Sequence, residues 1–128
     1  MSGEWIKKIY LEKNEIDLIV KELKKYSFED YIKTEHYDLS ILSKGTDEEN
    51  LKEIYKKFNL IKMVLLRKRK GGYDNYDFYY ELDKGNYALF AIHFAVNGKP
   101  EMVNAFVSGT IFKNFLKSVI KRYGRNMI

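Results

Sequence analysis

The spacing of apolar residues changes near Leu60, and this change constrains the fold more than any other feature of the chain. Before it, apolar side chains recur every three or four residues, as in helices. After it, they alternate with polar side chains over four runs, at residues 60–69, 76–83, 86–96 and 101–108. The segments between the runs are short enough for hairpin turns, so we expect a four-stranded antiparallel meander.

The alternation predicts which face of the two central strands is buried. The side chains expected on the buried face are Tyr76, Phe78, Tyr80, Leu82, Phe90, Ile92, Phe94 and Val96. The side chains expected on the less buried face are Asp77, Tyr79, Glu81, Tyr87, Ala91, His93 and Ala95.

Helical spacing precedes and follows the meander. Asn14 is a suitable N-cap for a helix over about residues 15–26, and Thr46 with Glu49 forms a capping box for a second helix. Ser27 and Asp30 indicate a further short helical start, whereas residues 34–45 are compatible with either a helical turn or an extended segment.

A C-terminal helix is expected to pack on the sheet through an apolar stripe and to end at Gly124. The stripe residues expected to touch the sheet are Phe112, Phe115, Leu116 and Val119. The predicted fold is therefore a single α+β domain over residues 1–128. It has N-terminal helices, the meander and a C-terminal helix, arranged as a two-layer sandwich with all helices on one face.

Composition limits the cellular context and the chemistry. The chain has no Cys, which excludes disulfides and thiolate metal sites, and its longest nearly apolar run is too short to cross a membrane. We therefore expect a cytoplasmic protein without membrane association. Only two His are present, no metal-site or Gly-rich phosphate-binding motif occurs, and we expect neither a metal nor a cofactor.

The net charge of +5 is unevenly distributed. Residues 1–59 are net acidic, whereas residues 60–72 and 102–128 each carry five cations and no acid. If the fold joins these two segments, they form a surface for the phosphates of nucleic acid, RNA more than DNA. The candidate binding residues beyond Arg67 and Arg69 are Lys68, Lys70, Lys113, Lys117, Lys121, Arg122 and Arg125. The alternative is that these side chains are simply solvated.

Paired helices followed by a four-stranded antiparallel sheet and a basic C-terminal segment resemble the RelE and barnase-like superfamily of small metal-independent ribonucleases, many of them toxins. The resemblance covers roughly residues 14–123 and lies in architecture, since the superfamily shares no strict motif. It implies His36 or His93 for acid–base chemistry, Arg67 and Arg69 for phosphate stabilisation, and Tyr79 for stacking or proton transfer. It also implies an antitoxin-like protein partner.

Each candidate also has a purely structural interpretation. His93 is expected in a strand, where a half-buried, hydrogen-bonded His is common, and His36 lies in a segment suited to a cap or turn. Strands favour Tyr irrespective of function. The alternative to nucleic-acid binding is therefore a non-catalytic interaction domain, for example a homodimer joined through an open apolar face around Ala91 and Ala95.

Overall fold

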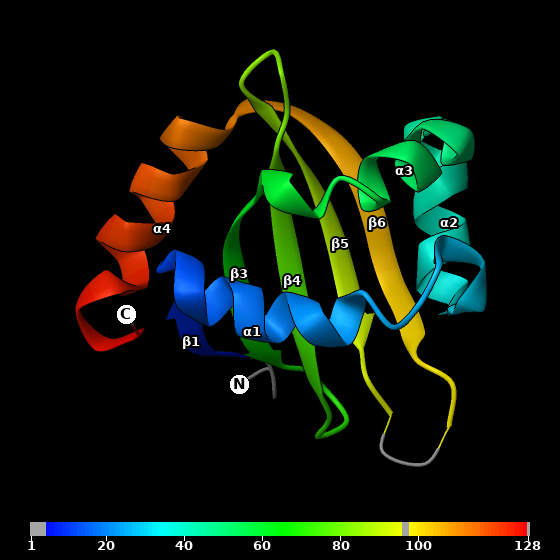
Figure 1. Ribbon diagram of the computed structural model, residues 1–128, viewed down its shortest axis with the longest axis horizontal. Coiled ribbons are helices and arrows are strands. Elements are labelled where there is room, and N and C mark those ends of the chain that lie inside the picture. Colours follow the sequence, from blue (N-terminus) through cyan, green and yellow to red (C-terminus); the bar gives the residue numbers. More distant parts are fainter. Residues whose placement is uncertain (1–4, 96–97, 128) are drawn as a thin grey trace.

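The structure is a computed structural model that describes residues 5–95 and 98–127 (Figure 1). The strands are β1 (Trp5–Tyr10), β2 (Ile32–Lys33), β3 (Ile61–Lys68), β4 (Asp74–Glu81), β5 (Asn86–His93) and β6 (Glu101–Ile111). The helices are α1 (Lys13–Leu23), α2 (Glu35–Lys44), α3 (Glu48–Tyr55) and α4 (Phe112–Met127), with 3-10 turns η1 (Phe28–Asp30) and η2 (Phe58–Leu60).

The described strands form one six-stranded sheet in the order β1-β3-β4-β5-β6-β2, which curves into a half-barrel (Figure 1). Strands β3 to β6 are consecutive antiparallel neighbours, but β1 adds antiparallel to β3 and β2 adds parallel to β6. The expected four-stranded meander with only helices before it is therefore wrong, because the N-terminal half of the chain supplies both edge strands.

The missed edge strands carry weak sequence signals. In β1 a register shift between Ile6 and Lys8 interrupts the alternation, so that only Ile6 and Ile9 are buried. Strand β2 has two residues, which pair with Glu101 and Met102. A strand this short has no periodicity to detect.

Helices cover both faces of the sheet, which corrects the expected two-layer arrangement. One core packs α1 and α3 against the sheet, through residues that include Val20, Leu51, Tyr55, Phe78, Tyr80 and Phe90. A second core packs α4 against the opposite face, here called the α4 face, through residues that include Met63, Leu65, Tyr79, Tyr87, Phe112 and Val119. Phe115 and Leu116 pack against this second core as expected.

Helix α4 covers the second face of the sheet, and two residues that we expected on the less buried face are therefore buried. Asp77 is 1% exposed and Tyr79 is 4% exposed, because α4 and the arginines of β3 lie over this face. Ala91 is also fully buried and so contributes to no open apolar patch. His93 is half-buried.

The helix boundaries show which capping signals were correct. Ser27 and Asp30 form a capping box around η1, with the Ser27 amide donating to Asp30 at 2.7 Å. Helix α1 begins earlier than expected, after Glu12, so Asn14 is inside it. Helix α3 is capped by Asp47 instead of Thr46, since Asp47 accepts a hydrogen bond from the Glu49 amide.

The ambiguous segment at residues 34–45 is mostly helix α2, capped by Thr34 and ended by Gly45 in the left-handed region at φ 59°. Helix α4 continues past Gly124 to Met127, which corrects the expected end. Strand β5 ends at His93, while Val96, the expected last residue of this strand, lies outside the described residues.

Candidate functional site

The α4 face carries a row of polar side chains where β3, β4 and β5 lie side by side. Arg67 on β3 is directly opposite Asn75 on β4. Tyr76 of β4 is opposite Ile92 of β5, and because these strands are antiparallel, the preceding residue Asn75 lies beside the following residue His93. Glu101 on β6 is opposite His93. The register therefore places an arginine, an amide, an imidazole and a carboxylate in one line across four strands.

Asp77 lies two residues from Asn75 on the same face of β4 and connects the polar side chains of β3 and β4. Its Oδ2 accepts from Arg67 Nε at 2.9 Å, and its Oδ1 accepts from Asn75 Nδ2 at 2.7 Å and lies 3.5 Å from Arg69 Nη2. Arg69 Nε also donates to Asn75 Oδ1. One buried carboxylate thus holds two guanidinium groups, and the set keeps a net positive charge.

The surroundings of Arg67 and Tyr79 raise the pKa of both side chains. Burial alone would lower the pKa of Arg67, but the charge of Asp77 and its hydrogen bond outweigh burial and raise the pKa above its usual range. For Tyr79, burial and the nearby Asp77 charge raise the pKa, and Arg67 offsets this only in part. Arg67 is therefore a permanent cation, and Tyr79 is a neutral phenol that can donate a hydrogen bond.

A pocket of about 210 Å³ opens beside this set, between α4 and strands β1, β3 and β4. Its polar lining residues are Arg67, Tyr79, Ser118, Arg122 and Tyr123. Its apolar lining residues are Ile6, Leu65, Phe115 and Val119. Arg67 comes from the first basic segment and Arg122 from the second, so the fold joins the two segments at this pocket. Two guanidinium groups beside three hydroxyl groups suit an anion of phosphate type.

His93 is oriented by the backbone. Its Nδ1 lies 2.7 Å from the carbonyl oxygen of Asp74, and its ring contacts Tyr73 with centroids 4.8 Å apart. A carbonyl oxygen only accepts, so Nδ1 carries the hydrogen and Nε2 has the lone pair of a base in the neutral ring.

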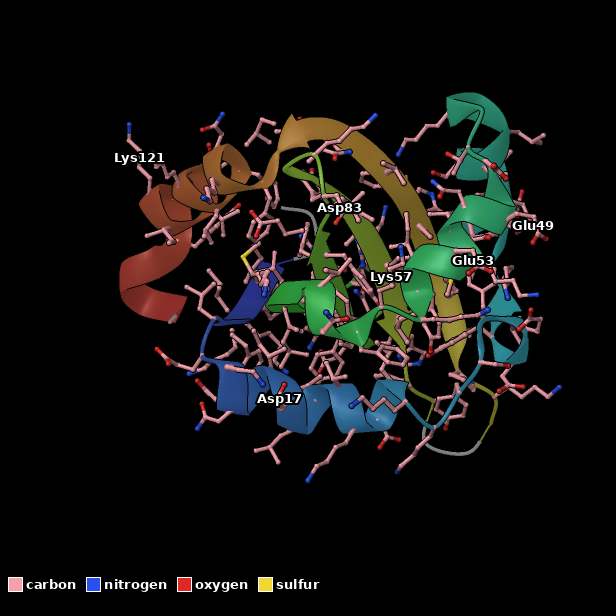
Figure 2. All side chains as sticks on the ribbon, turned by 45° about the horizontal axis from the view of Figure 1, so that its top comes forward. Asp17, Glu49, Glu53, Lys57, Asp83 and Lys121 are labelled. Atoms are coloured by element: carbon pink, nitrogen blue, oxygen red, sulfur yellow. The ribbon has the colours of Figure 1, made fainter. Side chains whose placement is uncertain are left out.

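The structure separates the remaining predicted residues. The side chain of Lys68 lies over the Trp5 ring, at 5.1 Å from the centroid, and Lys70 is exposed beside the β3–β4 turn. Lys113 and Lys117 are exposed on α4, and Lys121 points away from the sheet (Figure 2). Of the predicted α4 cations, Arg122 lines the pocket. The side chain of Arg125 lies outside the described residues.

His36 is not joined to the other candidates. It is exposed on α2 and lines a different groove, between α2 and β6. The structure therefore brings Arg67, Arg69, Tyr79 and His93 to one face of the sheet and leaves His36 elsewhere.

The sequence interpretation missed Asn75 and Asp77 as partners of the arginines, and Ser118 and Tyr123 as pocket residues. The first two had a detectable signal. The Gly71–Gly72 turn fixes the register of the β3–β4 hairpin, so Arg67 is paired with Asn75 and lies diagonal to Asp77. Ser118 and Tyr123 had no such signal, because their role depends on how α4 lies on the sheet.

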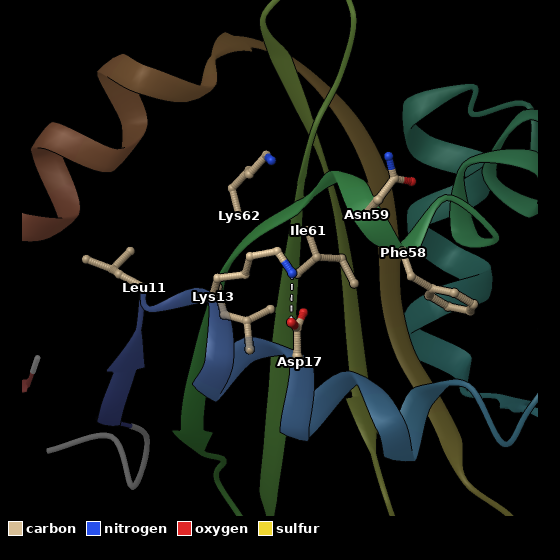
Figure 3. A pocket seen from close by; sticks show the side chains of 8 residues that line it. Leu11, Lys13, Asp17, Phe58, Asn59, Ile61 and Lys62 are labelled. Atoms are coloured by element: carbon tan, nitrogen blue, oxygen red, sulfur yellow. Dashed lines mark hydrogen bonds and ion pairs between the residues drawn. The ribbon is translucent and has the colours of Figure 1, made fainter.

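A second pocket, of about 180 Å³, lies between the start of α1 and β3 (Figure 3). Its walls are mainly apolar, and include Leu11, Phe58 and Ile61. Its charged residues Lys13 and Asp17 pair with each other at 2.8 Å, which leaves Lys62 as the remaining cation of its lining. This pocket suits an anion less well than the one at Arg67.

Over the described residues, no cluster of three His, Cys, Asp or Glu side chains is placed to share a metal ion. Within the same part of the chain, none of the helices combines the length and hydropathy that crossing a membrane requires. Comparison with known protein families, with curated proteins and with solved structures finds no match for this chain.

Proposed function

We propose that this protein binds single-stranded RNA, with a backbone phosphate in the pocket between α4 and the sheet. The observation that carries the proposal is the presence of Arg67 and Arg122, one from each acid-free basic segment, in the lining of the same pocket. Arginine is well suited to phosphate because its planar guanidinium donates two parallel hydrogen bonds.

The local charge supports this assignment. Arg67, Arg69 and Arg122 carry three positive charges on the α4 face, and the buried Asp77 balances one of them. Asp74, the next carboxylate of β4, pairs with Lys7 at 3.0 Å. A phosphate that enters the pocket therefore meets an excess of positive charge.

RNA is favoured over duplex DNA by the aromatic side chains beside the basic set. The ring of Tyr73 lies against His93 and is half-buried, so that part of it is accessible to an unstacked base. Base stacking on aromatic rings is the common means of recognising single strands.

Fluorescence anisotropy with a labelled RNA of about 12 nucleotides tests the proposal at ~50 mM and ~200 mM salt. We expect binding that weakens steeply with salt. The Arg122→Gln variant should bind more weakly and reduce the salt slope by about 0.7, the contribution of one phosphate contact on a single strand.

Lys57→Gln is the matched control, because it removes an exposed positive charge beside α3, which packs on the opposite face of the sheet. Equal losses in the two variants would indicate unspecific attraction to a basic protein. Absence of binding at ~50 mM salt would refute the proposal and favour an interaction domain that joins a protein partner or a second copy.

A second candidate function, metal-independent RNA cleavage, is favoured by the orientation of His93. Its Nε2 would accept the 2′-hydroxyl proton, and the 2′ oxygen would then attack the adjacent phosphorus. The bond from phosphorus to the 5′ oxygen breaks, the 5′ oxygen takes a proton from water, and a 2′,3′-cyclic phosphate remains. Arg67 and Arg69, on the same face, would stabilise the added negative charge on the phosphate.

A further inference from the structure

A further polar groove lies toward the opposite edge of the sheet from the RNA pocket, between α2 and β6. Figure 1 shows α2 running beside β6. The groove has a volume of about 290 Å³. Its lining residues are His36, Leu39, Ser40, Ser43, Lys44 and Asn104. The α2 residues recur at intervals of three and four, so they share one side of the helix, and they line the groove together with Asn104 of β6.

Two buried polar atoms of this groove have no hydrogen-bond partner. They are Ser40 Oγ and Asn104 Oδ1, and no other buried side-chain N or O atom in the described residues lacks a partner. Ser40 is only 6% exposed. Leaving a buried polar atom unpaired typically costs about 1–3 kcal/mol, so two such atoms in one groove indicate a site built for a ligand.

The charge of the groove is positive. Lys44 Nζ lies 3.7 Å from the centroid of the Phe106 ring, at the side of the groove, and His36 adds an imidazole. No carboxylate lines the groove. Leu39 supplies an apolar wall and is itself 57% exposed. The groove therefore offers a cation, hydroxyl donors, an amide acceptor and an apolar surface.

We propose that this groove binds a small 2-hydroxy carboxylate with an apolar side chain. The ligand carboxylate pairs with Lys44 and accepts from the Ser40 hydroxyl. The ligand hydroxyl donates to Asn104 Oδ1, and its apolar chain packs on Leu39. Each of the two unpaired atoms thereby gains a partner of the required polarity.

The acceptor at Asn104 selects against an anion without a hydrogen, such as inorganic sulfate. Sulfate satisfies Lys44 and Ser40, but it is fully deprotonated and has no hydrogen to donate to Oδ1 of Asn104. A simple carboxylate without the hydroxyl group fails in the same way. The hydroxyl on the carbon next to the carboxylate is therefore the specificity-determining group of the ligand.

NMR titration of the ¹⁵N-labelled protein tests this proposal with 2-hydroxy-4-methylpentanoate, 4-methylpentanoate and inorganic sulfate. We expect the hydroxy acid to shift the amide signals of Ser40, Lys44 and Asn104, and to bind about 10-fold more tightly than the parent acid. Equal affinity for all three probes, or shifts centred elsewhere, would overturn the proposal.

Two variants separate ligand binding from folding. Lys44→Gln should weaken binding of the hydroxy acid at least about 10-fold, because it removes a charge-assisted hydrogen bond. Lys24→Gln is its matched control, since Lys24 also lies over an aromatic ring, that of Phe58 at 5.9 Å, but outside the groove. Equal effects of the two variants would overturn the proposal.

Ser40→Ala should weaken binding about 5-fold or more while the free protein melts at the same temperature or higher, because the lost hydroxyl has no partner in the free state. A lower melting temperature would show that this hydroxyl is satisfied without a ligand, which would contradict the proposal. RNA binding by Ser40→Ala and Lys44→Gln should equal that of the wild type, so this site and the RNA pocket are tested separately.

Discussion

Arg67 and Asp77 form a diagonal ion pair across β3 and β4, with Arg67 Nε 2.9 Å from Asp77 Oδ2. The residue directly opposite Arg67 is Asn75, and its amide donates to the other oxygen of the same carboxylate. The carboxylate of Asp77 is therefore shared, and it fixes the direction of both arginines on the α4 face. The basic residues proposed to bind phosphate are positioned by an acid that is almost completely buried.

Asp77→Asn should lower the free energy of unfolding by about 3 kcal/mol, because it leaves the partly buried guanidinium of Arg67 without its counter-charge. Urea denaturation measures the change. Asp17→Asn is the control, since its ion pair with Lys13 is exposed and such pairs contribute less than about 1 kcal/mol. Similar losses in both variants would show that Asp77 acts only as another surface charge.

Packing of α4 on the sheet depends on its first residue. Phe112 is 3% exposed within the second core, so Phe112→Ala should destabilise the protein by about 3–5 kcal/mol through lost burial and an unfilled cavity. Ile120→Ala on the same helix is the control, because Ile120 is 41% exposed and should lose less than about 1 kcal/mol. Thermal unfolding of the two variants compares these effects.

The central strands were predictable because their side chains alternate over at least seven residues. Strands β3 to β6 occupy the four expected runs with end shifts of a few residues. The alternation could not show that helices cover both faces of the sheet. In a strand buried on both faces, every position carries an apolar residue or a polar residue with a partner, so alternation does not identify an open face. This explains why Tyr79 was expected on the more open face and lies in the second core.

The candidate site was predictable to a similar extent. The resemblance to small ribonucleases implied Arg67 and Arg69 as phosphate-stabilising residues, and in the structure these two arginines share one face and the partner Asp77. Charge counting grouped Lys68 with Arg67 and Arg69. Side chains alternate along a strand, so Lys68 points to the other face of the sheet, and it lies over the Trp5 ring. The contact of Arg122 with the same pocket depends on the position of α4, which no local pattern encodes.

Alkaline pH should destabilise the protein through its buried tyrosines. The hydroxyls of Tyr31 and Tyr55 lie 2.6 Å apart, and burial raises the pKa of both above the ordinary value of 10.0. The folded state therefore holds these protons more tightly than the unfolded chain. Their contribution to stability is fully present below about pH 10 and is lost as the pH rises further, by about 1.4 kcal/mol per pH unit for each group.

Tyrosinate absorbance and circular dichroism followed during one alkaline titration measure this effect. We expect ionisation of the buried tyrosines to coincide with unfolding. In Tyr31→Phe, which removes one of these ionisable groups, stability should fall less steeply above pH 10. Complete ionisation of all tyrosines in a protein that stays folded would contradict the burial of this pair.

Cleavage of RNA in the presence of EDTA distinguishes the catalytic candidate from simple binding. We expect the wild-type protein to produce fragments ending in 2′,3′-cyclic phosphate, and His93→Ala to reduce the rate about 100-fold, the usual contribution of a general base. His36→Ala, purified in parallel, should retain the wild-type rate because His36 lies in the groove between α2 and β6. Equal rates in the two variants would assign the cleavage to a contaminating nuclease. Intact RNA with retained binding would mean that the Nε2 of His93, although held by the Asp74 carbonyl on the same face as Arg67 and Arg69, serves no acid–base step.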